Sequence, residues 1–200
     1  MSPVGKRRLR RIIILAGVLL VAFVGVLLVI YPLHRGNQDK ADERFRQMSI
    51  EVTRDYTRFW PAGVETVNRS VVAARVSHAF SDVKAQELLT CPNLVELDLS
   101  QCDFVDPRAL ARMSGLTRLR SLSLAGTPVD DGVLPVLATW SALRDLNLDR
   151  TGVTAAGLHE FLRQRKVKSV SVSGAKVTPA EVKEMRQTFP EVEIQVEGAG

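Results

Sequence analysis

The chain has 200 residues, of which 46% are hydrophobic, and a formal net charge of +5. Residues 1–11 carry five Lys or Arg side chains and no acid, so the remaining residues hold 22 basic and 22 acidic side chains. A nucleic-acid-binding domain normally carries its own basic surface. The charge distribution therefore argues against nucleic acid as a partner.

Residues 12–33 form a segment of 22 residues without a charged side chain. A helix of this length, at about 1.5 Å per residue, spans the roughly 30 Å hydrocarbon core of a bilayer. A cleaved signal peptide would have a shorter apolar part of about 7–15 residues and a small-residue cleavage site. A buried core helix is the other alternative, but no neighbouring sequence would cover it. We predict an uncleaved, single-pass transmembrane helix contacting the lipid bilayer.

The orientation of this helix follows from the basic residues 1–11, because positively charged flanks stay in the cytoplasm. We therefore predict a cytoplasmic N-terminal tail and a remainder of the chain outside the cytoplasm. Residues 34–70 would link the membrane segment to the folded domain. Within them, apolar residues spaced by 3 or 4 predict an amphipathic helix over residues 39–59. These residues are Ala41, Phe45, Met48, Val52, Tyr56 and Phe59.

Two interpretations of the helix over 39–59 remain open at this point. It could be a cap or stalk that folds against the domain. It could instead be a seam for a partner helix or for a homo-oligomer. Pro61 disfavours helix at the residue before it, so the helix should end near Trp60.

The pattern L-x-x-L-x-L, with Val replacing Leu in the last copy, occurs four times. The copies begin at Leu94, Leu119, Leu143 and Val167, which are 25, 24 and 24 residues apart. Each copy alternates apolar and polar residues, which predicts a short strand with one buried face. Weaker copies around residues 71–76 and 191–196 extend the repeats over residues 71–197, with a short tail at 198–200. A period near 24 residues is typical of a solenoid.

A second pattern follows each predicted strand. Asp106, Asp130, Thr154 and Thr178 are spaced by 24 residues, and Asp82 lies 24 residues earlier. Asp and Thr are favoured helix N-caps, because their side-chain oxygens accept the free N–H groups of the first turn. Apolar residues follow most of these caps after four and seven positions, which predicts short helices with one buried side. After Asp130, Pro135 should delay the helix.

These residues resemble a leucine-rich repeat. Residues 143–158 (LRDLNLDRTGVTAAGL) are similar to the short bacterial form L-x-x-L-x-L-x-x-T-x-V-T-x-x-G-L, and residues 119–134 match nearly as well. The resemblance implies an α/β solenoid with parallel strands on its concave face and short helices on its convex face. It also implies a protein-binding or scaffold module. A self-associating structural protein of the cell envelope, joined through residues 39–59 or the terminal strand, is the alternative.

Few residues point to catalysis or to a cofactor. Cys91 and Cys102 flank a predicted strand of about 20 Å, whereas bridged cysteines need Cα atoms within about 7 Å. His159-Glu160 begins a zinc-protease motif, but Arg163 stands where its second His belongs. We therefore expect no catalytic residue, no metal and no cofactor.

The polar residues that alternate with the leucines should form the exposed face of the strands. One basic residue in each of three repeats should flank that face as a rim. Either the face is simply solvated, or it binds a protein partner. The residues predicted to carry such binding are Glu96, Asp98, Arg120, Arg144, Asp145, Asn147, Asp149 and Lys168.

Overall fold

The computed structural model describes residues 40–59 and 66–196, with side chains for residues 40–54 and 71–196. The chain divides into two compact units, Met1–Arg44 and Phe45–Gly200. The predicted N-terminal tail, the transmembrane segment 12–33 and the C-terminal tail lie outside the described residues. Among the helices of the described part, none has the length and apolar character needed to cross a membrane.

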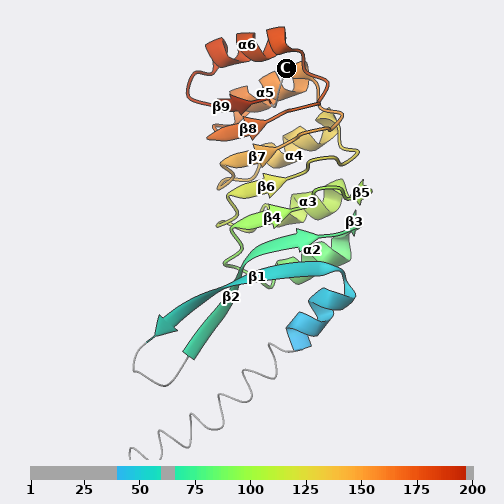
Figure 1. Ribbon diagram of the computed structural model, residues 1–200, viewed down its shortest axis with the longest axis vertical. Coiled ribbons are helices and arrows are strands. Elements are labelled where there is room, and N and C mark those ends of the chain that lie inside the picture. The colour runs from blue at the N-terminus through green and yellow to red at the C-terminus, as the bar shows by residue number, and fades with distance from the viewer. Residues whose placement is uncertain (1–39, 60–65, 197–200) are drawn as a thin grey trace, which may run out of the picture. The chain divides into compact units, whose positions relative to one another are not determined.

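A seven-stranded sheet organises the second unit, in the order β1-β2-β4-β6-β7-β8-β9. From β2 onward the neighbouring strands are parallel and in register. The strands at the centre of the predicted blocks, with the terminal one, are β4 (Glu96–Asp98), β6 (Ser121–Ser123), β7 (Asp145–Asn147), β8 (Ser169–Ser171) and β9 (Glu193–Gln195). Figure 1 shows them stacked in one ladder. The prediction of a parallel repeat sheet is confirmed.

Short helices connect successive strands on one side of this sheet (Figure 1). They are α2 (Asp82–Leu88), α3 (Pro107–Met113), α4 (Leu134–Ala138), α5 (Ala155–Gln164) and α6 (Pro179–Thr188). A single 3-10 turn, η1 (Asp131–Val133), precedes α4 and delays its start before Pro135, as predicted. A separate two-stranded sheet joins β3 (Ala79–Phe80) to β5 (Phe104–Val105).

The predicted caps are confirmed for α3, α5 and α6, and for the 3-10 turn η1 that precedes α4. Asp106 accepts a hydrogen bond from the backbone N–H of Arg108 at 2.9 Å, and Asp130, Thr154 and Thr178 act in the same way. The prediction for α2 was wrong by one residue. Ser81 is its N-cap and makes no side-chain bond there, while Asp82 is the first helical residue and pairs with Arg112 of α3.

The core is built from columns of apolar side chains that cross the sheet. One column pairs Leu97, Leu122, Leu146, Val170 and Ile194 in register, and all five are buried. A single unit could not bury its apolar side, so stability depends on neighbouring units. Cys91 and Cys102 are both buried and form no disulfide with each other.

The turn after each strand requires a left-handed backbone. Gln101, Gly126, Arg150 and Gly174 occupy equivalent places there, with φ of 62°, 67°, 53° and 67°. Glycine adopts this region without steric cost, whereas a side chain strains it. Two of the four turns therefore carry a residue that is locally unfavourable.

The helix predicted over residues 39–59 is wrong beyond its first half. Residues 40–47 are helical, Ser49 has φ of 55°, and β1 (Ile50–Phe59) then pairs antiparallel with β2 (Thr66–Val76). The positive φ of Ser49 ends the helical path, and Ile50, buried at 2% exposure, lies opposite Val76. A continuous helical seam over 39–59, whether for a partner or for a homo-oligomer, therefore does not form. The weak strand predicted at residues 71–76 is the second half of β2.

Candidate binding face

The exposed face of the ladder lies opposite the helices and consists of side chains in columns. The first column runs Glu96, Ser121, Asp145, Ser169 and Glu193, and the second runs Asp98, Ser123, Asn147, Ser171 and Gln195. Neighbouring members of a column are about 4.8 Å apart along the ladder, because that is the spacing of paired strands. We call these two columns, together with Asp149, the floor.

Serine separates the acidic or amide residues in both floor columns. Consequently Glu96, Asp145 and Glu193 stand on every second strand, about 10 Å apart. Like charges directly opposite each other on paired strands are destabilising. The alternation keeps a line of acids on the sheet without placing two of them side by side.

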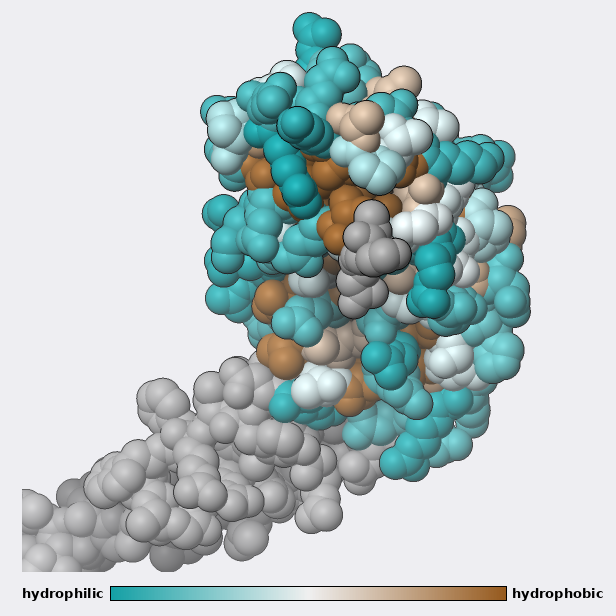
Figure 2. Space-filling model, turned by 45° about the horizontal axis from the view of Figure 1, so that its top comes forward, coloured by the Kyte–Doolittle hydropathy of each residue, from teal (hydrophilic) through white to brown (hydrophobic). Residues whose placement is uncertain are grey.

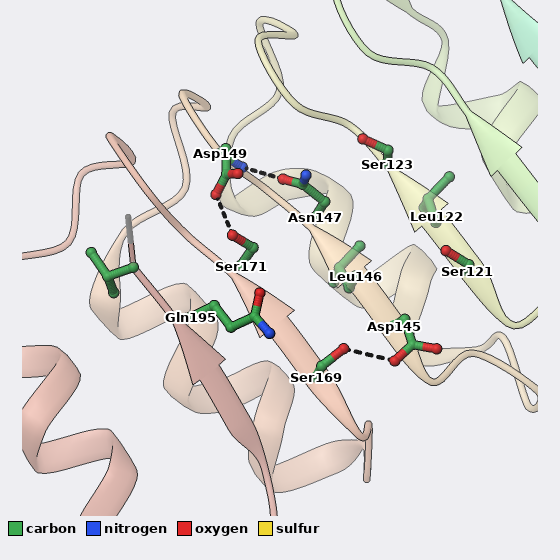
Figure 3. Close-up of a pocket in the computed structure, with 11 residues that line it drawn as sticks. Ser121, Leu122, Ser123, Asp145, Leu146, Asn147, Asp149, Ser169, Ser171 and Gln195 are labelled. Carbon is green, nitrogen blue, oxygen red and sulfur yellow. Dashed lines mark hydrogen bonds between the residues drawn. The ribbon is translucent and has the colours of Figure 1, made fainter. Parts of the chain in front are cut away.

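The serines also hold the carboxylates in place (Figure 3). The Ser169 hydroxyl donates to Oδ1 of Asp145 at 2.7 Å, and the Ser171 hydroxyl donates to Oδ1 of Asp149 at 2.6 Å. The backbone N–H of Ser173 donates to the same Asp149 oxygen at 2.7 Å. Among the described residues, neither Oδ2 atom has a hydrogen-bond partner, so each acid presents one orientated free oxygen.

The ends of β4 and β7 share a local turn that fixes the second column. Oδ1 of Asp98 accepts from the backbone N–H of Ser100 at 2.9 Å, and Oδ1 of Asn147 accepts from that of Asp149 at the same distance. Asp and Asn favour this bond to the backbone two residues on. The Asn147 amide group is thereby turned so that its N–H donors remain available to a ligand.

At the β2 side of the floor, Asp98 is already partnered within the chain. Arg75 of β2 donates from Nε to the Asp98 carboxylate at 2.7 Å. Partial burial of Asp98 opposes its ionisation, but hydrogen bonds from Ser100 and the Arg75 guanidinium outweigh it, so the pKa of Asp98 lies below its ordinary value. Asp98 is thus less available to a partner than Asp145 and Asp149.

The floor is hollowed between β6 and β9. The hollow has a volume of about 450 Å³, opens to solvent, and is lined mainly by small polar side chains. Ser121, Asp145, Ser169 and Gln195 point into it in Figure 3, whereas Leu122 and Leu146 line its base. Serines provide the room, since longer side chains on the same strands would fill this space.

The three predicted rim cations come together as expected. The backbone N–H of Arg144 donates to the Arg120 carbonyl at 2.8 Å, and that of Lys168 donates to the Arg144 carbonyl at 2.7 Å. The three residues are therefore direct neighbours on β-ladder rungs beside the first floor column, and all are exposed. No ion pair joins any of their side chains to an acid within the described residues. We call these three residues the rim.

The structure therefore brings all eight predicted residues onto one exposed face, with six of them around β6, β7 and β8. Glu96 and Asp98 lie two strands from β7, beyond β6. Sequence reasoning missed Arg75 and Gln195. Both belong to the weak outermost repeat patterns at residues 71–76 and 191–196, so extending the register to those patterns would have placed them on this face.

A second hollow, of about 500 Å³, lies at the β9 end of the ladder. Val192, Ile194 and Val196 line it, and Arg186 of α6 donates from Nε and one terminal nitrogen to the Ile194 carbonyl at 3.1 and 2.6 Å. Figure 2, in which this end is turned forward, shows apolar surface framed by hydrophilic residues. In the part of the chain that the structure describes, no cluster of three or more His, Cys, Asp or Glu side chains could hold a metal ion.

Comparisons with known proteins concern the repeat architecture. No family model and no curated protein matches the chain. A leucine-rich-repeat protein of Leptospira interrogans is 20% identical over 55% of this chain, with a TM-score of 0.40, and the chain spans only 27% of its length. The ectodomain of the Arabidopsis thaliana receptor kinase SOBIR1 is 15% identical, covering 78% of this chain and 89% of that one, with a TM-score of 0.44. Pollen Receptor Kinase 3 is 14% identical, with coverages of 76% and 90% and a TM-score of 0.37.

Proposed function

We propose that this chain is a non-catalytic, membrane-anchored leucine-rich-repeat module that holds a protein partner outside the cytoplasm. The observation that carries the proposal is the contrast between the rim and the floor. Three exposed cations without a described ion-pair partner border a hollow whose acids are fixed by serines and point free oxygens outward. Columns of opposite sign favour a complementary partner and reject others.

The proposed anchor is residues 12–33, and the proposed contact surface is the floor with the rim. Each ion pair between exposed side chains contributes little to the free energy of binding, about 0–1 kcal/mol. Single substitutions of rim cations should therefore change partner binding only slightly. Reversal of all three should change it clearly, and the binding should weaken as salt is raised, because exposed pairs are screened over about 8 Å at physiological salt.

Affinity capture from detergent-solubilised membranes tests the proposal. The full chain should retain a partner protein, and the triple variant Arg120→Glu, Arg144→Glu, Lys168→Glu should lose it. A matched control reverses three exposed cations away from this face, Arg108, Lys176 and Lys183, with the same change in net charge. Equal loss of the partner in both triple variants would show that the effect comes from net charge alone. Equal retention of the partner would exclude the rim as the contact surface.

A reporter fused after Gly200 tests the membrane topology. A reporter that is active only in the cytoplasm should be silent there, and the same reporter joined before residue 12 should be active. Activity of the C-terminal fusion would reject the proposed location of the repeats.

Self-association of a structural envelope protein is the second candidate, and the open hollow beside the terminal strand β9 is the observation that favours it. Arg186 opposes it, because its guanidinium occupies the Ile194 carbonyl that an added strand would need. Sedimentation of the Arg186→Ala variant distinguishes the two candidates. A monomeric variant rejects self-association through this edge.

A further inference from the structure

The charged side chains of the rim and the floor recur at fixed distances along the ladder. These distances can be compared with the repeat distances of peptide conformations. Rim cations occur on three adjacent rungs, hence about every 4.8 Å. Acids of the first floor column, Glu96, Asp145 and Glu193, occur on alternate rungs, hence about every 10 Å. A segment that runs across the strands meets both spacings at once.

An α-helix matches both spacings. One turn rises about 5.4 Å, so acidic side chains placed once per turn would fall within about 0.6 Å of the rim spacing at each rung. Residues seven apart on a helix are separated by about 10.5 Å, close to the spacing of the floor acids. Side chains on one face of an extended segment are about 6.8 Å apart and would miss each rung by about 2 Å.

Backbone hydrogen bonding favours the same choice. β6, β7 and β8 are each paired on both sides, so an extended partner lying over them could not add a strand to the sheet. Extended peptides obtain much of their affinity from such pairing. A helix satisfies its own backbone and needs only a surface of suitable shape. The hollow is lined there by Ser121, Ser169 and Ser171, whose short side chains leave room for a helix to approach.

We propose that the segment bound by this face is an α-helix of a partner protein that lies across the strands, with one acidic residue per turn over Arg120, Arg144 and Lys168. Lys or Arg residues about seven positions apart on the same helix lie over Asp145 and its neighbours in the first floor column. The inference rests on the proposed function and specifies the chemistry of its partner.

Photo-crosslinking measures the conformation of the bound segment directly. p-Benzoyl-phenylalanine is introduced separately at Ser121 and Ser169 of the full chain in membranes, and the crosslinked partner residues are identified by mass spectrometry. The two positions are two rungs apart. A helix crossing the strands gives attachment points about six to seven residues apart, whereas an extended segment gives about three. The control position is Thr188, exposed on α6.

Attachment points six to seven residues apart, in a segment with the stated charge pattern, support the proposal. Points about three apart, or points in unrelated segments, overturn it while leaving the proposed function standing. Capture of a rim-sensitive partner without a crosslink from Ser121 or Ser169 also overturns it. Failure of the capture experiment itself overturns the proposed function instead.

Charge reversal on both partners provides the second test. The triple rim reversal should weaken association at least tenfold, and replacing the acidic residues of the identified helix by Lys should restore it for that variant only. Loss without restoration would show that those acids do not face the rim.

Discussion

The inward and outward columns of the same three-residue strands have opposite compositions. Leu97, Leu122, Leu146, Val170 and Ile194 form an inward column that is uniformly apolar and buried. One residue earlier on each strand, the outward column alternates Ser with Glu or Asp. Adjacent positions thus face the core and the solvent separately, so the outward residues can differ between repeats while the fold is kept.

The largest expected effect comes from placing an outward residue type in the inward column. Leu146→Asp buries a carboxylate without a partner, which costs several kcal/mol, a large part of the stability of a domain. Thermal unfolding of the full chain in detergent should show loss of the cooperative transition. Asn147→Asp, on the next residue of β7, is the matched control and should melt close to the parent. Equal melting of Leu146→Asp and the parent would show that the register is wrong.

A smaller effect is expected where a polar side chain is part of the core. Thr151 is buried, and its hydroxyl donates to the Leu148 carbonyl at 2.7 Å. Thr151→Val should lower the free energy of unfolding by about 1–2 kcal/mol, because the carbonyl loses its donor away from water. Thr139→Val removes the same kind of bond at an exposed residue, to the Val136 carbonyl at 2.7 Å. Urea unfolding should show a clearly smaller loss of unfolding free energy for Thr139→Val than for Thr151→Val. Similar losses in the two variants would mean that burial of the hydroxyl does not determine the size of the effect.

The repeat ladder was predictable because every unit restates the same pattern, so an ambiguous position is corrected by its counterparts 24 residues away. The hairpin of β1 and β2 had no such counterpart. Apolar residues in 41–59 fit a helical spacing, while Ile50 and Val52 also fit the two-residue period of a strand. The pairing of Ile50 with Val76 makes this segment a strand. It is a contact between distant positions that local spacing does not encode.

The columns of the candidate face were predictable for the same reason, but their internal bonds were not. Alternation placed Asp145 and Asp149 outside, yet it could not show that Ser169 and Ser171 would hold them. The ion pair of Asp98 with Arg75 depends on β2 lying beside β4, which the weak pattern at residues 71–76 only suggested.

The turn after each strand contains a residue with a left-handed backbone. Substitutions at two equivalent turns are expected to change the free energy of unfolding in opposite directions. Gly174→Ala should destabilise by about 1 kcal/mol, because a side chain at φ of 67° is strained. Its added Cβ would also lie 3.2 Å from the Arg150 side chain. Arg150→Gly at the equivalent turn should stabilise by up to about 1 kcal/mol. Denaturant midpoints moving in opposite directions would support the shared geometry, and a loss in both variants would contradict it.

The smallest expected effect concerns Asp98, the outward acid that is already neutralised by Arg75. Its pKa is lower in the folded chain than its ordinary value, so the ionised carboxylate stabilises the fold at neutral pH. That contribution is lost as pH falls below about 4 and the carboxyl group becomes protonated in both states. Because the Arg75 and Asp98 side chains are 64% and 29% exposed, the contribution should not exceed about 1 kcal/mol.

Asp98→Asn keeps an oxygen for the Ser100 N–H but removes the charge. Its free energy of unfolding should lie below that of the parent at neutral pH and approach it as pH falls below about 4 and through the lowered pKa of Asp98, where the parent also loses the charge. Arg75→Gln removes the other half of the pair and should show the same convergence. Denaturant unfolding at a series of pH values measures both. A constant difference across the series would mean that packing of the Asp98 side chain, and not its charge, connects β2 to the repeat ladder.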